Sequence, residues 1–350
     1  MLKWLVVAVA LAACGDDGST ASDAGGSDAR SDAPPGVMEE VHYGGRFDAT
    51  KQFAWPGSSL TTRFSGTTIS IALEDGGENW FEITVDGVNQ PPLQAMAGAR
   101  SYVLASGLAD GEHDLVFARR TESFFGTSKF DAFTNATLVP TPRPQRYIEF
   151  IGDSITCGYG VLGASATCMF DATTEAETRA WARLTADSLG ALHASIAYSG
   201  IGMTRNNGGS TDNTMPDRYT RLFADDAESV WGFSYTPDVI VINLSTNDYA
   251  MGDPGVAFET TYVAFIKNLR SHFPNVPVLI ATSPMLGNEA RTTLRAHLDA
   301  IAGQLDGVHV MDLAEQMPAD GLGCDYHPST VTDQKMAVVA TQAIRDVTGW

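Results

Sequence analysis

Hydrophobic and polar positions follow two different periods along the chain. Between residues 37 and 140, short runs alternate apolar and polar residues with a period of two, as in residues 68–73 and 81–85, and turn signals such as Asp86-Gly87 follow them. Such alternation is typical of half-buried strands. The short spacing of these runs predicts an all-β sandwich over residues 37–140, with a jelly roll as the specific expectation. The expected strands are residues 67–73, 80–86, 101–104, 112–118 and 132–139.

From residue 145 to residue 350 the pattern changes. Short apolar runs alternate with stretches in which apolar residues recur every three or four positions. Strands that alternate with helices predict an α/β sandwich of three layers on a parallel sheet. Pro142 and Pro144 mark a short, stiff linker between the two regions. The expected strands are residues 147–151, 194–198, 239–244, 278–281 and 308–312, and the main expected helices are residues 175–189, 256–273, 288–305 and about 332–347.

The N-terminus has the pattern of a bacterial export signal. Lys3 precedes an apolar run over residues 4–13 that is too short to span a bilayer. The run ends in Leu11-Ala12-Ala13-Cys14, which resembles a lipobox, so we expect a signal peptide over residues 1–14 and lipid attachment at Cys14. Residues 15–36 are rich in Gly, Ser, Ala and Asp and predict a flexible tether. Gly15 after the cysteine favours the outer membrane as the site of anchoring, and a plain secretory signal is the alternative.

Composition limits the partners of this chain. The formal net charge of −20 argues against a nucleic-acid partner, because phosphate binding needs a basic surface. The seven histidines are scattered without metal-ligand spacing, so we predict no metal site, and nothing in the pattern requires a cofactor. The only membrane contact that we expect is the N-terminal lipid anchor.

Three further cysteines, Cys157, Cys168 and Cys324, predict one disulfide and one free thiol in an exported protein. We favour Cys157–Cys168, which closes a short loop, over Cys157–Cys324.

Polar residues with catalytic potential follow the expected strands. Ser154 comes after the first strand, Gly200 after the second, Asn247 after the third, and His327 lies in a loop beyond the fifth. Parallel strands place their carboxyl ends at one edge of the sheet, where active sites of such folds form. A serine hydroxyl becomes an effective nucleophile when a neighbouring base accepts its proton, and His327 can be that base.

These segments resemble, in order, the four motif blocks of the SGNH/GDSL hydrolase superfamily. The resemblance implies that Ser154 is the nucleophile and His327 the general base. It also implies an oxyanion hole formed by the backbone N–H groups of Ser154 and Gly200 and by the side chain of Asn247. Asp248 is expected to be structural, and Asp153 is expected to accept backbone hydrogen bonds.

One position departs from the superfamily pattern. The aspartate that usually lies three residues before the histidine is Cys324 here, and Asp325 lies two before it. Neighbouring side chains of an extended loop point to opposite sides. We therefore expect a backbone carbonyl, rather than the uncertain third member Asp325, to orient His327 in a Ser154–His327 dyad.

Both regions are also similar to carbohydrate esterase family 2, over about residues 40–350. The segments that carry this similarity include Gly44-Gly45-Arg46-Phe47, Arg119-Arg120-Thr121-Glu122 and residues 152–160 around Ser154. The resemblance implies a serine esterase that removes O-acetyl groups from carbohydrate, such as xylan or glucomannan, through an acyl-enzyme. Two alternatives stay open. One is an SGNH esterase for short-chain lipid, thioester or aryl esters, and the other is a surface-anchored carbohydrate-binding protein with a vestigial hydrolase domain.

Overall fold

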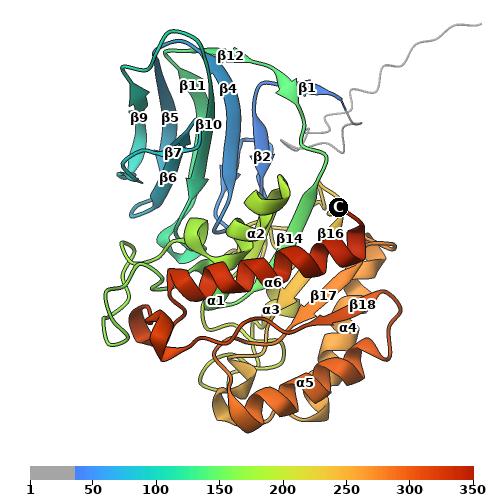
Figure 1. Ribbon diagram of the computed structural model, residues 1–350. Coiled ribbons are helices and arrows are strands. Elements are labelled where there is room, and N and C mark those ends of the chain that lie inside the picture. The colour runs from blue at the N-terminus through green and yellow to red at the C-terminus, as the bar shows by residue number, and fades with distance from the viewer. Residues whose placement is uncertain (1–35) are drawn as a thin grey trace, which may run out of the picture.

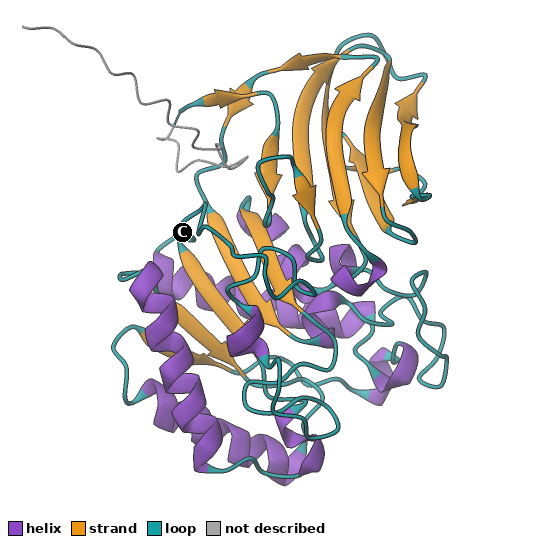
Figure 2. Ribbon diagram, turned by 180° about the vertical axis from the view of Figure 1, so that it is seen from behind, coloured by secondary structure: helices purple, strands orange, loops and turns teal. Residues whose placement is uncertain are grey.

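The computed structural model describes residues 36–350, which form an antiparallel β-rich region and an α/β region (Figures 1 and 2). The predicted signal peptide, Cys14 and the tether up to residue 35 lie outside the described residues. Over residues 36–350, no helix combines the length and the apolar character needed to cross a membrane.

The N-terminal region consists of two antiparallel sheets that pack face to face (Figure 1). One sheet has the order β12-β4-β10-β6-β7, with β2 beside β4 and β8 beside β6. Its strands are β2 (His42–Gly44), β4 (Ser59–Ser65), β6 (Trp80–Val85), β7 (Val88–Asn89), β8 (Leu93–Gln94), β10 (Glu112–Arg119) and β12 (Thr137–Val139). The other sheet has the order β3-β11-β5-β9, with β3 (Gln52–Phe53), β11 (Ser128–Thr134), β5 (Thr68–Asp75) and β9 (Gly98–Ser106). A short pair, β1 (Met38–Glu39) and β13 (Thr141–Pro142), joins the ends of the region.

An aromatic core fills the space between these sheets. Burial alternates along β6, as its sequence pattern predicts, and Phe81 stacks on Phe117 with ring centroids 4.6 Å apart. The two sheets confirm the predicted β-sandwich. The single strand expected at residues 132–139 is wrong, because Asn135 adopts a positive φ of 63° and turns the chain between β11 and β12. Strand β4 was missed because only Leu60 and Phe64 in it are apolar.

The C-terminal region is a parallel sheet between two layers of helices, which confirms the predicted three-layer α/β sandwich (Figure 2). The strand order is β15-β14-β16-β17-β18, with β14 (Tyr147–Gly152), β15 (Leu192–Ala197), β16 (Val239–Asn243), β17 (Val278–Ala281) and β18 (Val308–Met311). Helices α2 (Trp181–Leu189) and α6 (Thr330–Thr348) pack on one face. The other face is covered by α4 (Val256–His272) and α5 (Asn288–Ala302).

Helix α2 begins six residues later than the prediction of residues 175–189. The segment before it contains only a short 3-10 turn, η2 (Glu177–Arg179). The side chain of Glu177 is fully buried and accepts hydrogen bonds from Ser195 at 2.6 Å and from His193 Nε2 at 2.9 Å. These contacts hold the segment against the sheet, so the helix starts only at Trp181.

The β-sandwich contributes two large side chains to the core of the α/β region. Trp55 packs in that core and donates from its indole N–H to the carbonyl of Leu222 at 2.8 Å. The buried Arg46 guanidinium lies 3.7 Å from the ring centroid of Trp231 and 3.7 Å from a carboxylate oxygen of Glu149. The two regions are therefore joined by buried contacts as well as by the linker.

Candidate active site

Ser154 lies at the point where β14 ends and a one-turn helix, α1 (Ser154–Cys157), begins. Asp153 caps this helix, because its Oδ1 accepts a hydrogen bond from the N–H of Ile155 at 3.0 Å. A side chain at Gly152 would place its Cβ 2.1 Å from Thr156 Oγ1, so the turn requires glycine there. Burial raises the pKa of Asp153 to about 7. The sharp turn presents Ser154 at the carboxyl edge of the sheet.

The structure brings His327 to Ser154. Nε2 of the imidazole lies 2.9 Å from Ser154 Oγ, although the two residues are 173 positions apart. On the other side of the ring, Nδ1 lies 3.1 Å from the carbonyl oxygen of Asp325 and 3.3 Å from that of Cys324. These carbonyls can only accept, so Nδ1 carries the proton and Nε2 presents its lone pair to the hydroxyl. Burial lowers the pKa of His327, which favours the neutral imidazole that a general base requires.

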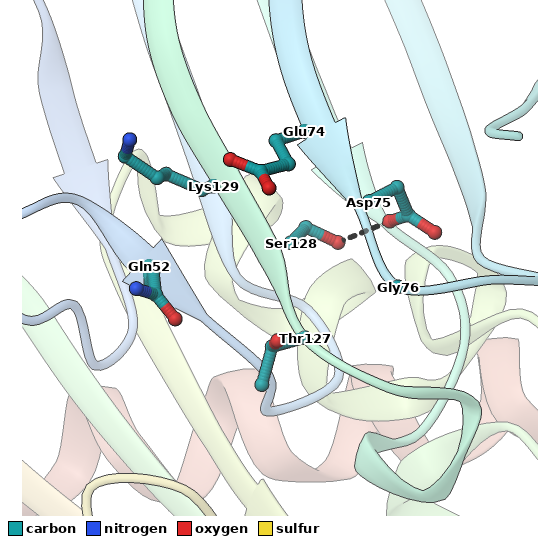
Figure 3. A pocket seen from close by; sticks show the side chains of 7 residues that line it. All are labelled: Gln52, Glu74, Asp75, Gly76, Thr127, Ser128 and Lys129. Atoms are coloured by element: carbon teal, nitrogen blue, oxygen red, sulfur yellow. Dashed lines mark hydrogen bonds between the residues drawn. The ribbon is translucent and has the colours of Figure 1, made fainter. Parts of the chain in front are cut away.

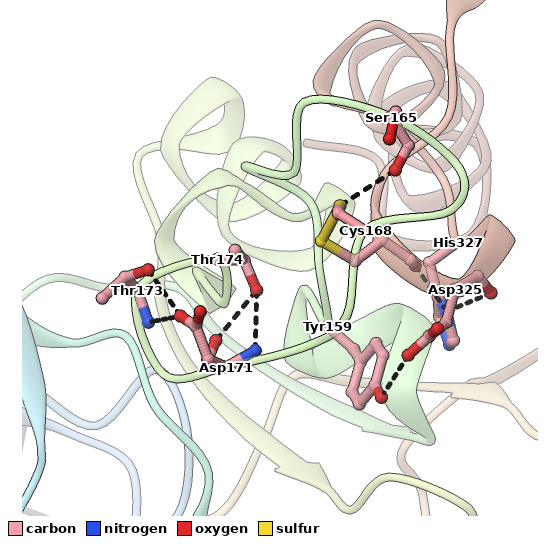
Figure 4. The surroundings of a disulfide bond; sticks show 9 residues. Tyr159, Ser165, Cys168, Asp171, Thr173, Thr174, Asp325 and His327 are labelled. Atoms are coloured by element: carbon pink, nitrogen blue, oxygen red, sulfur yellow. Dashed lines mark hydrogen bonds between the residues drawn. A yellow bond between two sulfur atoms is a disulfide. The ribbon is translucent and has the colours of Figure 1, made fainter.

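The carboxylate of Asp325 points away from His327. Asp325 has a positive φ of 50°, and its Oδ2 accepts a hydrogen bond from the hydroxyl of Tyr159 at 2.9 Å (Figure 4). The Tyr159 ring also packs against His327, with centroids 4.4 Å apart, and stacks on Phe170 at 3.8 Å. Sequence reasoning missed the role of Tyr159. Its only signal was its place between Gly158 and Gly160 in the segment around the serine.

On the opposite side of Ser154, the loop after β15 carries Gly200 with a φ of 77°. Within residues 36–350, no hydrogen bond uses the backbone N–H of Ser154 or of Gly200. The side-chain amide of Asn247 donates to the carbonyl of Ile201 at 2.7 Å, and its distance to Asp153 Oδ2 is 3.5 Å. One amide hydrogen of Asn247 is thus only weakly engaged. The three donors predicted for an oxyanion hole converge on the same edge of the sheet.

Comparison with known proteins places both regions of the chain in known families. The family model described as "Carbohydrate esterase 2 N-terminal" matches residues 43–142, and that of the "GDSL-like Lipase/Acylhydrolase family" matches residues 150–334. The solved structure of a family two carbohydrate esterase from Clostridium thermocellum, in complex with cellohexaose, is 36% identical with a TM-score of 0.84. It covers 89% of this chain and 99% of its own. This chain belongs to carbohydrate esterase family 2.

Curated relatives agree with the assignment to family 2, whose members are carboxylic ester hydrolases. Cellulase/esterase CelE of Acetivibrio thermocellus is 36% identical over 90% of this chain, which spans only 40% of that relative's length. An acetylxylan esterase / glucomannan deacetylase of Cellvibrio japonicus is 28% identical over 92% of this chain and 91% of its own length.

In this family 2 esterase, Asp248 holds the loop that carries Gly200. One carboxylate oxygen, Oδ2, accepts from the N–H of Met203 at 2.8 Å, and the other accepts from the N–H groups of Thr204 at 2.7 Å and Arg205 at 3.1 Å. Asp248 is fully buried and does not contact Ser154 or His327 through any hydrogen bond in the described chain. This placement agrees with the structural role expected for it.

The predicted disulfide is wrong. Cys168 is bonded to Cys324, with Cα atoms 4.7 Å apart (Figure 4). Cys157 is a free, buried thiol. Cys157 lies on the inner side of α1 with the buried carboxyl groups of Glu122 and Glu175, and burial raises its thiol pKa well above the ordinary value. The Cys157 thiol therefore lies in an interior site beside carboxyl groups, while Cys168 and Cys324 pair with each other. The bond that does form ties the loop after Gly160 to the loop that carries His327.

Two further cavities are lined by residues other than Ser154 and His327. A cavity of about 140 Å³ lies on the β-sandwich (Figure 3), where the hydroxyl of Ser128 donates to the buried Asp75 carboxylate at 2.6 Å. That carboxylate is already bonded within the sandwich and has a structural role. A hollow of about 230 Å³ lies beside Gly200 and is lined by Tyr198, Ser199, Ile201 and their neighbours. No group of three or more potential metal ligands occurs in residues 36–350.

Proposed function

We propose that this family 2 esterase hydrolyses O-acetyl esters on carbohydrate, with Ser154 as nucleophile and His327 as general base. The contact that carries the proposal is the 2.9 Å distance between Ser154 Oγ and the unprotonated Nε2 of a half-buried imidazole. Ser154 itself is 7% exposed, so a small part of its surface remains open to solvent. A hydroxyl paired with a base in this way can attack an ester carbonyl.

The first half of the reaction forms an acyl-enzyme. Ser154 Oγ bonds to the acetyl carbonyl carbon, and its proton passes to His327 Nε2. The negative charge moves to the carbonyl oxygen, where the N–H groups of Ser154 and Gly200 and the weakly engaged amide hydrogen of Asn247 can stabilise it. The bond to the sugar oxygen then breaks, and His327 returns its proton to that oxygen.

The second half restores the enzyme. A water molecule gives a proton to His327 Nε2, and its oxygen bonds to the acyl carbon. The tetrahedral intermediate uses the same three donors as before. The bond to Ser154 Oγ breaks, Oγ takes the proton from His327, and acetic acid leaves and ionises in water.

The imidazolium that forms in both halves has backbone carbonyls, and no side-chain carboxylate, as partners of Nδ1. The carbonyls of Cys324 and Asp325 fix the ring by accepting hydrogen bonds from Nδ1–H, so the pair works as a Ser154–His327 dyad. A carbonyl dipole stabilises the charged ring less than a carboxylate does. Asp325 instead acts on Tyr159, whose ring packs against the imidazole.

The substrate class rests on the relatives. One is named for acetylxylan and glucomannan, and another was solved with cellohexaose. The test is a substrate panel of acetylated xylan, acetylated glucomannan and p-nitrophenyl esters of increasing chain length. We expect release of acetate from a polysaccharide and a steep fall in kcat/KM beyond the acetyl ester. Preference for longer acyl chains would favour another esterase specificity, and binding of glycan without turnover would favour a vestigial hydrolase domain.

Export and lipid anchoring through Cys14 belong to the same proposal. The apolar run and the lipobox-like segment support it, and an outer-membrane position would hold the esterase close to polysaccharide outside the cell. Cys14→Ser should move the protein from the membrane fraction to the soluble exported fraction. A variant that stays with the membrane would rule out this anchor.

A further inference from the structure

Glu122 is a buried carboxyl group of the β-sandwich that contacts the loop of the hydrolase domain carrying Gly200. It follows β10 in the segment Arg119-Arg120-Thr121-Glu122, to which sequence reasoning gave no function. Its Oε2 accepts a hydrogen bond from the N–H of Ser199 at 2.6 Å, and its Oε1 accepts one from the Ser199 hydroxyl. Ser199 immediately precedes Gly200, so one side chain of the other domain holds both polar groups of the residue next to the oxyanion donor.

The backbone of Glu122 is itself fixed on both sides. Its N–H donates to Glu175 Oε2 at 2.9 Å, and its carbonyl accepts from the buried guanidinium of Arg119 at 2.7 Å. Arg120 in turn donates to the carbonyl of Glu175 at 3.1 and 3.2 Å. The two arginines of this segment thus support Glu122, Arg119 directly and Arg120 through Glu175.

Glu122 and Glu175 are two buried carboxyl groups that lie next to each other. Burial and the neighbouring charge of Glu122 raise the pKa of Glu175 well above its ordinary value, so the pair of carboxyl groups carries a proton that we place on Glu175. Burial also raises the pKa of Glu122, but hydrogen bonds from Ser199 and from the Cys157 thiol oppose that rise. Glu122 therefore contacts both the residue before Gly200 and the helix that begins with Ser154.

We propose that Glu122 is a positioning residue for the oxyanion hole, supplied by the β-sandwich. By fixing Ser199, it sets the orientation of the Ser199–Gly200 peptide, so that the Gly200 N–H stays unpaired and available to the oxyanion. The inference rests on the proposed function, in which that N–H stabilises the oxyanion. A donor that is slightly misplaced loses much of its effect, because the donors must be fixed before charge develops.

The experiment compares two carboxylates that cross between the domains. Glu82, on β6, pairs with Arg179 of the hydrolase domain and makes no hydrogen bond with residues 198–200. With p-nitrophenyl acetate, Glu122→Ala should lower kcat at least tenfold and change KM less than about threefold, since a displaced donor acts mainly in the transition state. Glu82→Ala should keep kcat within twofold of the wild-type value. Glu122→Gln retains an acceptor for the Ser199 N–H, so its kcat should lie closer to wild type than that of Glu122→Ala.

The outcomes separate this inference from the proposed function. A wild-type protein that does not hydrolyse the ester contradicts the proposed function and the inference with it. An active wild type with equal kcat in folded Glu122→Ala and Glu82→Ala overturns the role of Glu122 alone, as does an effect confined to KM. If circular dichroism shows that Glu122→Ala does not fold, Ser199→Ala decides, because it removes only the hydroxyl contact. A several-fold loss of kcat supports the role, and an unchanged kcat overturns it.

Discussion

The two flanks of Ser154 are held in place by different physical means. On the base side, the loop of His327 is fixed by a covalent bond between Cys168 and Cys324 and by uncharged backbone hydrogen bonds. On the oxyanion side, the loop of Gly200 is fixed by two buried carboxyl groups, of which Asp248 comes from its own domain and Glu122 from the other.

The difference follows from what each flank must present. The base side must orient one ring, and neutral carbonyls at its Nδ1 do this while leaving the half-buried imidazole uncharged. The oxyanion side must keep backbone N–H groups unpaired, which is costly unless the neighbouring backbone is tied down. Carboxylates are strong acceptors for the adjacent N–H groups, so they hold the loop firmly. Each of the following changes tests one flank against the other.

Removing the hydroxyl of Ser154, which lies between the two flanks, should cause the largest loss of activity. Ser154→Ala should lower the kcat for p-nitrophenyl acetate by about 10⁴-fold or more, because no acyl-enzyme can form. Its circular dichroism spectrum should match that of the wild type. Activity near the wild-type level in a folded variant would place the nucleophile elsewhere.

On the oxyanion side, Asn247→Ala should lower kcat by roughly 10²–10³, the usual loss for one oxyanion donor. KM should change little, since the contact strengthens only in the transition state. Steady-state kinetics on the acetyl ester measures both constants. A change confined to KM would make Asn247 a contact of the bound substrate instead.

On the base side, the paired change Cys168→Ser with Cys324→Ser removes the covalent brace while leaving His327 and its carbonyl partners in the sequence. We expect about a tenfold loss of kcat from a looser imidazole. Loss of the cross-link should also lower the free energy of unfolding by about 2–4 kcal/mol. Chemical denaturation and kinetics on the same preparation report the two effects. An unchanged kcat would mean that the hydrogen bonds alone position His327.

Asp325→Ala should reduce kcat by less than about tenfold, far below the roughly 10⁴-fold cost of neutralising a triad carboxylate. The reason is that the Asp325 side chain contacts Tyr159, and only its main-chain carbonyl contacts His327. Tyr159→Phe is the matched control, because it removes the same hydrogen bond from the other partner. A loss of three orders of magnitude in Asp325→Ala alone would make Asp325 a catalytic member.

The smallest expected effect is a shift in the pH dependence of kcat/KM. Catalysis needs neutral His327, so kcat/KM falls as pH decreases through the pKa of that residue. Burial lowers this pKa, and the hydrogen bonds to the Asp325 and Cys324 carbonyls and the charge of Asp325 offset the effect only in part, so the midpoint of the acidic limb should lie below the ordinary histidine value of 6.5. Asp325→Ala should move the midpoint to still lower pH. A wild-type midpoint above 6.5 would show that a carboxylate stabilises the imidazolium after all.

The sequence was sufficient to predict the site residues that lie directly after the parallel strands. Ser154, Gly200 and Asn247 each follow an apolar run directly, so the parallel sheet alone brings them to one edge. The His327 loop could be placed by its motif. The orientation of its ring by a backbone carbonyl followed from the single-residue offset of Asp325.

Contacts that depend on the path of irregular loops could not be predicted from the sequence. The Cys168–Cys324 bond depends on how residues 158–170 fold back, and that segment has no periodicity from which to predict its course. Glu122 lies 77 positions before Ser199 and in the other domain, so only the docking of the two domains reveals the contact.

The guanidinium of Arg46 ties the stability of one domain to that of the other. It is fully buried among Trp231, Tyr219 and Glu149 of the α/β region, and it belongs to the chain of the β-sandwich. Unfolding either domain alone would break its ion pair and leave a charge buried or unpaired, at a cost of several kcal/mol. The two domains should therefore melt as one cooperative unit, with equal calorimetric and van't Hoff enthalpies. A hydrolase domain produced without the β-sandwich would expose the cavity in its core that Arg46 and Trp55 fill. The two domains therefore depend on each other for stability, although their folds differ.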